Sequence, residues 1–193
     1  FRTTAVLADD RRAVRDVVLQ GLGSGLSSND RTLLSAASMA GSQAQTLIEE
    51  SIDEARTMAL DENAPVEQRT AAVHVLGYAT SHHDWQETFA SLLGPAQPMP
   101  VQEAALRVIG RSSSPRATDM LIDQWGGLTP AVQSQAIGVF MQTPQRVTAL
   151  LDAIEADRIP LPQISSTARS QLTEYRETTL ENRAQELLQA SGQ

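Results

Sequence analysis

An internal repeat is the sequence feature that most restricts how this chain can fold. The segments that show it are Val66–Tyr78 (VEQRTAAVHVLGY), Val101–Arg111 (VQEAALRVIGR) and Val132–Met141 (VQSQAIGVFM). Ala72, Ala105 and Ala136 occupy equivalent positions in the three segments. In each segment the small residue precedes a large one, and another large residue follows three positions on, which is the spacing of one buried helical stripe. Ala105 follows Ala72 by 33 residues and Ala136 follows Ala105 by 31 residues, a repeat length typical of stacked helical units.

The expected starts and ends of the repeat helices contain the residues that such positions favour. A proline lies near each start, where its missing N–H costs nothing; these prolines are Pro65, Pro100 and Pro130. Thr129, Asn63 and either Ser165 or Ser166 are predicted to cap the helices that follow them. Gly77 and Gly110 fall near expected helix ends, where glycine tolerates a left-handed conformation.

Helical spacing of apolar residues extends to the rest of the chain. Further helices are predicted at Asp9–Leu22, Asp30–Met39, Gln43–Leu60, Asp84–Leu93, Pro115–Trp125 and Pro144–Ala156, from Ser165 or Ser166 to about Tyr175, and from Thr178 or Thr179 to about Ala190. The links between most of them are short, so consecutive helices should pack antiparallel. The predicted fold is therefore all-α, a HEAT-like α-α superhelix of helix pairs. We expect residues 1–60 to form atypical N-terminal helices, as a cap or a small helical subdomain. Residues 61–193 are expected to form the repeats with C-terminal capping helices.

Composition excludes several classes of site and partner. The chain has no Cys, so it offers neither a disulfide nor a thiolate ligand nor a covalent attachment point for c-type haem. All 15 basic residues are Arg, which excludes the lysine of a phosphate-binding loop or of a Schiff base. The net charge of −8 and the pI of about 4.8 predict that nucleic acid is not a partner. No run of about 18 apolar residues occurs, so membrane insertion is not expected.

One candidate interaction surface follows from comparing equivalent repeat positions. His74 corresponds to Arg107 in the second repeat and to Gly138 in the third. Two polar residues and a very small one at equivalent positions predict an exposed stripe on the second helix of each pair. In HEAT-like stacks that helix lines the concave face, which is the usual binding surface. The candidate interaction residues are Arg69, His74, Glu103 and Arg107.

Other chemically distinctive residues are better explained by structure than by catalysis. The sequence His82-His83-Asp84 contains possible metal ligands, but adjacent residues rarely point to one centre, and we expect an exposed loop with Asp84 as helix cap. The acidic residues from Glu49 to Glu54 are expected to lie on a solvated helix face. Gly21–Gly25 lacks the spacing of a phosphate-binding loop and is expected to be a linker. Two tryptophans, Trp85 and Trp125, fall on apolar stripes and are predicted to lie in the core. We therefore predict no catalytic residue, metal site or cofactor in this chain.

A resemblance to a known kind of protein covers roughly residues 61–188. Asp61–Gly77 (DENAPVEQRTAAVHVLG) and Pro115–Pro160, with Trp125, Leu128-Thr129-Pro130-Ala131-Val132 and Ile159-Pro160, are similar to stretches of large secreted bacterial multidomain proteins. Those proteins look like membrane-bound dehydrogenases in which a HEAT-like segment lies between a β-propeller and a haem-binding c-type cytochrome domain. The resemblance implies a periplasmic or extracellular location, and neighbouring domains as contacts.

Two functions from different classes follow from these observations. The first is a non-catalytic helical-repeat scaffold or protein-interaction domain that binds neighbouring domains or a partner chain. The alternative, implied by the resemblance, is an accessory segment of a haem-containing dehydrogenase that docks its redox domains. A HEAT-like DNA-binding enzyme would need a basic concave groove, which the acidic pI disfavours. Because the sequence begins with Phe1 rather than Met, we expect a processed chain or a segment of a larger protein.

Overall fold

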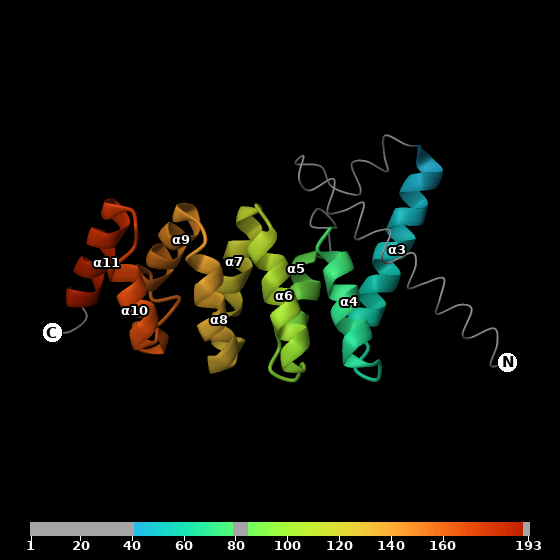
Figure 1. Ribbon diagram of the computed structural model, residues 1–193, viewed down its shortest axis with the longest axis horizontal. Coiled ribbons are helices and arrows are strands. Elements are labelled where there is room, and N and C mark those ends of the chain that lie inside the picture. The colour runs from blue at the N-terminus through green and yellow to red at the C-terminus, as the bar shows by residue number, and fades with distance from the viewer. Residues whose placement is uncertain (1–40, 79–84, 191–193) are drawn as a thin grey trace. The chain divides into compact units, whose positions relative to one another are not determined.

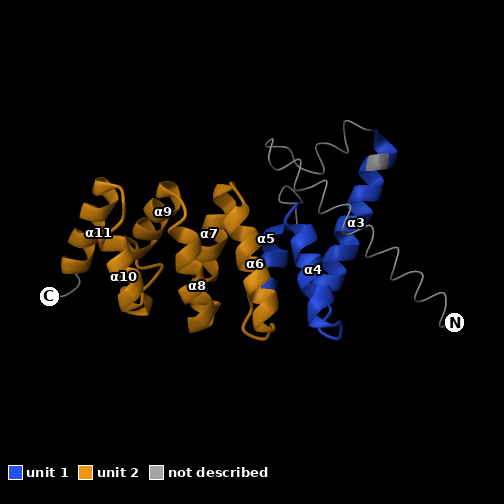
Figure 2. Cartoon of the chain, in the orientation of Figure 1, with its two compact units in different colours: residues 1–92 blue, residues 93–193 orange. Residues whose placement is uncertain are grey.

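The computed structural model describes residues 41–78 and 85–190, and all regular structure within these ranges is helical. The all-α prediction is therefore confirmed for the described part of the chain. The predicted helices Asp9–Leu22 and Asp30–Met39 lie outside the described residues. The chain divides into two compact units, which we call the N-terminal unit (residues 1–92) and the C-terminal unit (residues 93–193) (Figure 2). The predicted domain boundary at residue 60 remains a prediction.

Three described helices belong to the N-terminal unit: α3 (Ser42–Leu60), α4 (Val66–Leu76) and α5 (Trp85–Leu92). α3 packs against both α4 and α5. Its buried stripe of Ile52, Ala55 and Ala59 faces inward, while the acidic residue Asp53 is exposed as predicted. Trp85 is buried and stacks on Phe89 with ring centroids 4.5 Å apart, so the prediction of a core tryptophan is confirmed here.

The C-terminal unit contains six α-helices and two short 3-10 turns in its described residues. The bounds are α6 (Met99–Arg111), α7 (Pro115–Gln124), η1 (Trp125–Gly127), α8 (Pro130–Phe140), α9 (Pro144–Glu155), η2 (Leu161–Gln163), α10 (Ser166–Thr173) and α11 (Thr178–Ala190). These bounds lie close to the predicted ones. Trp125 is buried against Phe140, as predicted for a core residue.

Helix caps agree with the sequence predictions in two places and differ in one. The Thr129 hydroxyl accepts the Val132 N–H at the start of α8, and the Ser165 hydroxyl accepts the Ala168 N–H at the start of α10. Asn63 does not cap α4, so that prediction is wrong. The N-cap residue of α4 is Pro65, which makes no side-chain capping bond, and the Asn63 N–H instead donates to the Asp61 carboxylate within the preceding turn.

Neither of the two glycines predicted to end helices forms a left-handed cap. Gly77 follows α4 directly, but its φ of −60° is right-handed. Gly110 lies inside α6 rather than beyond its end. A Cβ at position 110 would lie 3.1 Å from the Gln142 Nε2 and 3.6 Å from a Val139 methyl carbon. The glycine therefore permits a close approach to the end of α8.

Alternate helices of the C-terminal unit pack side by side (Figure 1). α6 contacts α8, while α7 contacts α9, which in turn contacts α11. Glu103 near the start of α6 bonds to Gln135 in α8, and Gly110 near the end of α6 lies against Gln142 just after α8. The two helices therefore run parallel, as equivalent helices of successive repeats must if they stack.

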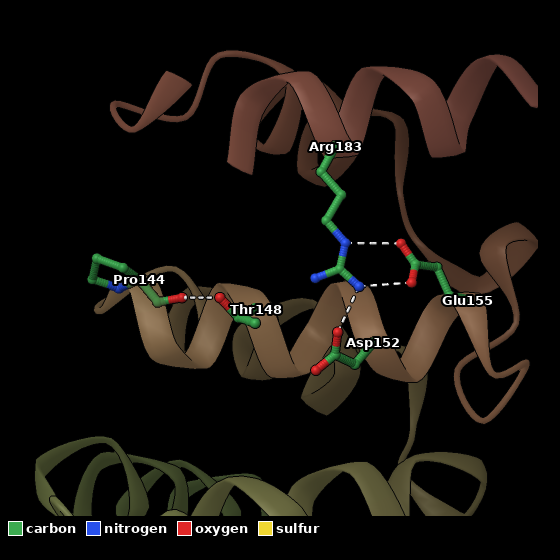
Figure 3. A network of polar contacts seen from close by, with 5 residues as sticks. All are labelled: Pro144, Thr148, Asp152, Glu155 and Arg183. Carbon is green, nitrogen blue, oxygen red and sulfur yellow. Dashed lines mark hydrogen bonds and ion pairs between the residues drawn. The ribbon is translucent and has the colours of Figure 1, made fainter. Parts of the chain in front are cut away.

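A cluster of charges joins α9 and α11 (Figure 3). The Arg183 guanidinium on α11 donates to both oxygens of Glu155, at 2.9 and 2.6 Å, and to Asp152 at 2.5 Å. This bidentate hydrogen bonding holds the pKa of Glu155 below its ordinary value of 4.5, and the same contacts raise the pKa of Arg183.

A direct titration should detect this contact. We expect the Glu155 carboxyl carbon, followed by NMR, to titrate with a midpoint below 4.5, and Arg183→Gln to raise that midpoint. Because the folded-state pKa is depressed, the stabilisation from this pair is present above pH 4.5 and is lost as the pH falls through the folded-state value. Arg176→Gln removes a guanidinium that lies over the Tyr175 ring instead, and should leave the midpoint unchanged. An unchanged midpoint in Arg183→Gln would contradict the assignment.

Candidate interaction site

The groove between α6 and α8, with a volume of about 400 Å³, is the candidate site in the C-terminal unit. α6 contributes Glu103, Arg107 and Arg111, and the other wall is formed by Gln135, Val139 and Gln142. Its floor is apolar because Leu106 and Val139 are buried between the helices. Its rim is polar, because four exposed polar side chains border it: Arg107, Arg111, Gln135 and Gln142. A polar rim over an apolar strip is the usual make-up of a protein-binding surface.

The buried side chain of Arg146 on α9 connects the ends of α6 and α8 at one end of this groove. Its side chain is only 7% exposed, and its two terminal nitrogens donate to five acceptors. On α6 and just beyond it these are the carbonyls of Ile109 at 3.0 Å, Gly110 at 2.9 Å and Ser112 at 2.5 Å. On the α8 side they are the Val139 carbonyl at 3.3 Å and the Gln142 Oε1 at 2.8 Å.

The position of Arg146 explains how a buried cation is tolerated. Carbonyls in the last turn of a helix lack intrahelical partners and carry the negative end of the helix dipole. Arg146 donates to such carbonyls on both α6 and α8. Its positive charge is therefore offset by the negative ends of two helix dipoles. Burial lowers the pKa of the Arg146 guanidinium, which still leaves it charged at neutral pH.

The structure brings together two of the four predicted interaction residues. Glu103 and Arg107 both line the groove, and the Gln135 amide donates to Glu103 at 3.1 Å. Arg107 is exposed, as predicted, and Glu103 is half-buried. His74 is half-buried on α4 in the N-terminal unit, where it does not belong to this groove.

The prediction that Arg69 lies on an exposed stripe is wrong. Its side chain is only 2% exposed, and its Nε donates to the Ala59 carbonyl in the last turn of α3 at 3.0 Å. The long apolar stem of an arginine can be buried among helices while its guanidinium satisfies a backbone carbonyl. Arg69 therefore serves the packing of α4 on α3 and is withdrawn as an interaction candidate.

Arg69 belongs to a series of equivalent side chains that the sequence comparison overlooked. The fourth residue of each of α4, α6, α8 and α10 is a long polar residue that donates to a carbonyl of the chain preceding its own helix; these residues are Arg69, Gln102, Gln133 and Arg169. Gln102 donates to Gly94 at 2.7 Å and Gln133 to Trp125 at 3.0 Å. Arg169 donates to Leu161 at 2.8 Å and to Ile164 at 2.9 Å. We call these four residues the capping series.

Three polar residues of the groove were not predicted from the sequence: Arg111, Gln135 and Gln142. Arg111 lies one helical turn after Arg107, so extending the predicted stripe by four residues would have found it. Gln135 follows Glu103, and Gln142 follows Gly110, by an interval close to that of the sequence repeat. The repeat offset would therefore have identified pairs of residues that face each other across two neighbouring helices.

Several other predicted features fall outside the described residues or remain expectations. His82, His83 and Asp84, together with the predicted Gly21–Gly25 linker, lie outside the described ranges. Within the described ranges, no group of three or more His, Asp or Glu side chains is arranged to hold a metal ion. None of the helices described combines the length and apolar character needed to cross a membrane.

Comparisons with protein-family models, curated proteins and solved structures find no match to this chain.

Proposed function

We propose that this chain is a non-catalytic, HEAT-like helical-repeat domain that binds a partner protein along the groove between α6 and α8. The groove itself is the observation that supports this most directly. It lies between equivalent helices of successive repeats and combines a buried apolar floor with an exposed polar rim. Its lining contains no His, Ser or Thr, and its one carboxylate, Glu103, accepts a hydrogen bond from Gln135. Such a surface suits recognition better than chemistry.

The HEAT-like part of the proposal is supported by the agreement between sequence repeat and structure. The repeat seen in the sequence relates the helices α4, α6 and α8 to one another. At the fourth position of each, an equivalent side chain makes an equivalent capping bond. Stacked repeats of this kind present the grooves between their helices as continuous binding surfaces. We also propose, from the resemblance, a periplasmic or extracellular location within a larger protein.

Site-specific photo-crosslinking tests the proposed binding surface. A benzophenone amino acid placed at Gln135 or at Gln142, in cells of the source organism, should capture the same protein, identified by mass spectrometry of the adduct. The matched control is the same amino acid at Asp119, which is exposed on α7 and does not line the groove. Equal capture from the groove and from position 119, or no capture from either groove position, would contradict the proposal.

A further inference from the structure

The arginines of the described residues differ in whether they have a partner within the protein. Eight have one: Arg56, Arg69, Arg116, Arg146, Arg158, Arg169, Arg176 and Arg183 contact carboxylates, carbonyls, an aromatic ring or another group of the chain. Arg107 and Arg111 alone among the described arginines have no hydrogen-bond, ion-pair or aromatic-ring partner. Both are exposed, and both line the groove. Among the described residues, the two arginines without a partner therefore lie at one surface.

These two side chains form a pair on one face of α6. Residues four apart on a helix lie about 6 Å from each other, so both guanidinium groups can reach one ligand. Arg111 lies in the last turn of α6, where the helix dipole favours a cation. That effect does not extend to Arg107, which lies a full turn earlier. On a chain of net charge −8, two neighbouring cations without partners are available to an anionic ligand.

The Gln142 amide adds a third donor at the same end of the groove. Its Oε1 accepts a hydrogen bond from Arg146, which fixes the orientation of the amide and leaves the Nε2 as the group that can meet a ligand. Arg107 and Arg111 thus offer donors only, and the Gln142 Nε2 adds a further donor beside them. At the opposite end, Glu103 is a carboxylate already bonded to Gln135. The groove therefore favours acceptor-rich, negatively charged groups near Arg111 and disfavours them near Glu103.

We propose that the groove binds an acidic peptide segment of a partner protein, with Arg107, Arg111 and Gln142 holding its carboxylates and Leu106 with Val139 contacting an apolar side chain between them. This inference rests on the proposed function and names the chemistry of the partner. A peptide is favoured over nucleic acid because two cations bind one or two carboxylates well. A long polyanion such as nucleic acid would, in addition, be repelled by the net negative charge of the protein.

Fluorescence polarisation with synthetic peptides tests this proposal on the full chain. The probe is a fluorescein-labelled peptide of repeated Glu-Leu-Glu units, and its matched control has Gln in place of every Glu. We expect the Glu peptide to bind and the Gln peptide to bind at least tenfold more weakly. Arg107→Gln or Arg111→Gln should weaken binding about threefold each, and both together about tenfold, as expected for exposed charge pairs. Arg176→Gln removes the same charge elsewhere and should change the affinity less than twofold.

Other outcomes would reject this inference in distinguishable ways. No binding of the Glu peptide, or binding that is unaffected by both groove substitutions, overturns the inference. Equal affinity for a fluorescein-labelled oligothymidine, or displacement of the peptide by inorganic phosphate at equal concentration, overturns the assignment to carboxylates. Photo-capture from Gln135 that persists in Arg107→Gln, Arg111→Gln without any binding of the Glu peptide leaves the proposed function standing and rejects the acidic ligand alone.

Discussion

Replacing Arg146 with methionine is expected to lower the free energy of unfolding of the C-terminal unit by about 3–5 kcal/mol. The methionine side chain fills much of the volume but cannot donate to the carbonyls of Ile109, Gly110 and Ser112. These acceptors are partly or fully buried, so losing their donor costs their desolvation as well as the hydrogen bonds. The loss of the contact to Val139 also frees the end of α8 from the end of α6.

Urea denaturation followed by tryptophan fluorescence measures this effect in the unit concerned. The chain has 2 tryptophans, with Trp85 in the N-terminal unit and Trp125 in the C-terminal unit, so Trp85→Phe leaves a reporter for residues 93–193. Arg146→Lys keeps the charge, but a lysine ammonium cannot reach five acceptors spread over two helix ends, and most of the loss should remain. Arg176→Met, an exposed position, should change stability by less than about 0.5 kcal/mol. A loss below about 1 kcal/mol in Arg146→Met would contradict the structural role assigned here.

Replacing Arg69 with leucine is expected to destabilise the N-terminal unit by about 2–4 kcal/mol. Leucine cannot donate to the Ala59 carbonyl, and it leaves unfilled the space that the longer side chain occupies. Arg69→Gln should cost roughly half as much, because Gln occupies the equivalent position in α6 and α8 and caps the preceding chain there.

The reporter for this second measurement is Trp85, in a Trp125→Phe background. An exposed residue of the same unit, Glu50 on α3, supplies the matched control, and Glu50→Gln should be close to neutral. If Arg69→Leu were as mild as the Glu50 substitution, Arg69 would be a surface residue after all. If Arg69→Gln were as damaging as Arg69→Leu, the equivalence of the capping series would be wrong.

The sequence predicted the helical fold well because the fold depends on local patterns. Apolar spacing, prolines at helix starts and hydroxyl caps act within one or two turns, and they placed α6–α11 close to their observed bounds. The core positions of Trp85 and Trp125 followed from the same stripes. The predicted cap at Asn63 is an exception, because Pro65 occupies the N-cap position of α4 instead.

The candidate site was predicted only in part, because the rest depends on contacts between helices that are far apart in the sequence. Glu103 and Arg107 lie on a helix face that periodicity identifies. The burial of Arg69, however, depends on a carbonyl of α3 being within reach, and its polar type alone suggested exposure. The alignment did hold a clue, since Gln102 and Gln133 stand at the equivalent position beside buried residues. A long polar residue recurring beside the apolar stripe indicates an inward hydrogen bond, not a binding face.

The contacts that join successive helix pairs have a consequence for how fast the chain folds. Hydrogen bonds between neighbouring pairs in the C-terminal unit link residues 28 to 38 positions apart, as in Arg183 with Glu155 and Trp125 with Gln163. The chain entropy lost in closing a loop of that length is much the same at each junction. None of these contacts requires the closure of a much longer loop than the others. The contact order is therefore low, and folding should be rapid. Any pair that forms first can template the next, in either direction along the unit.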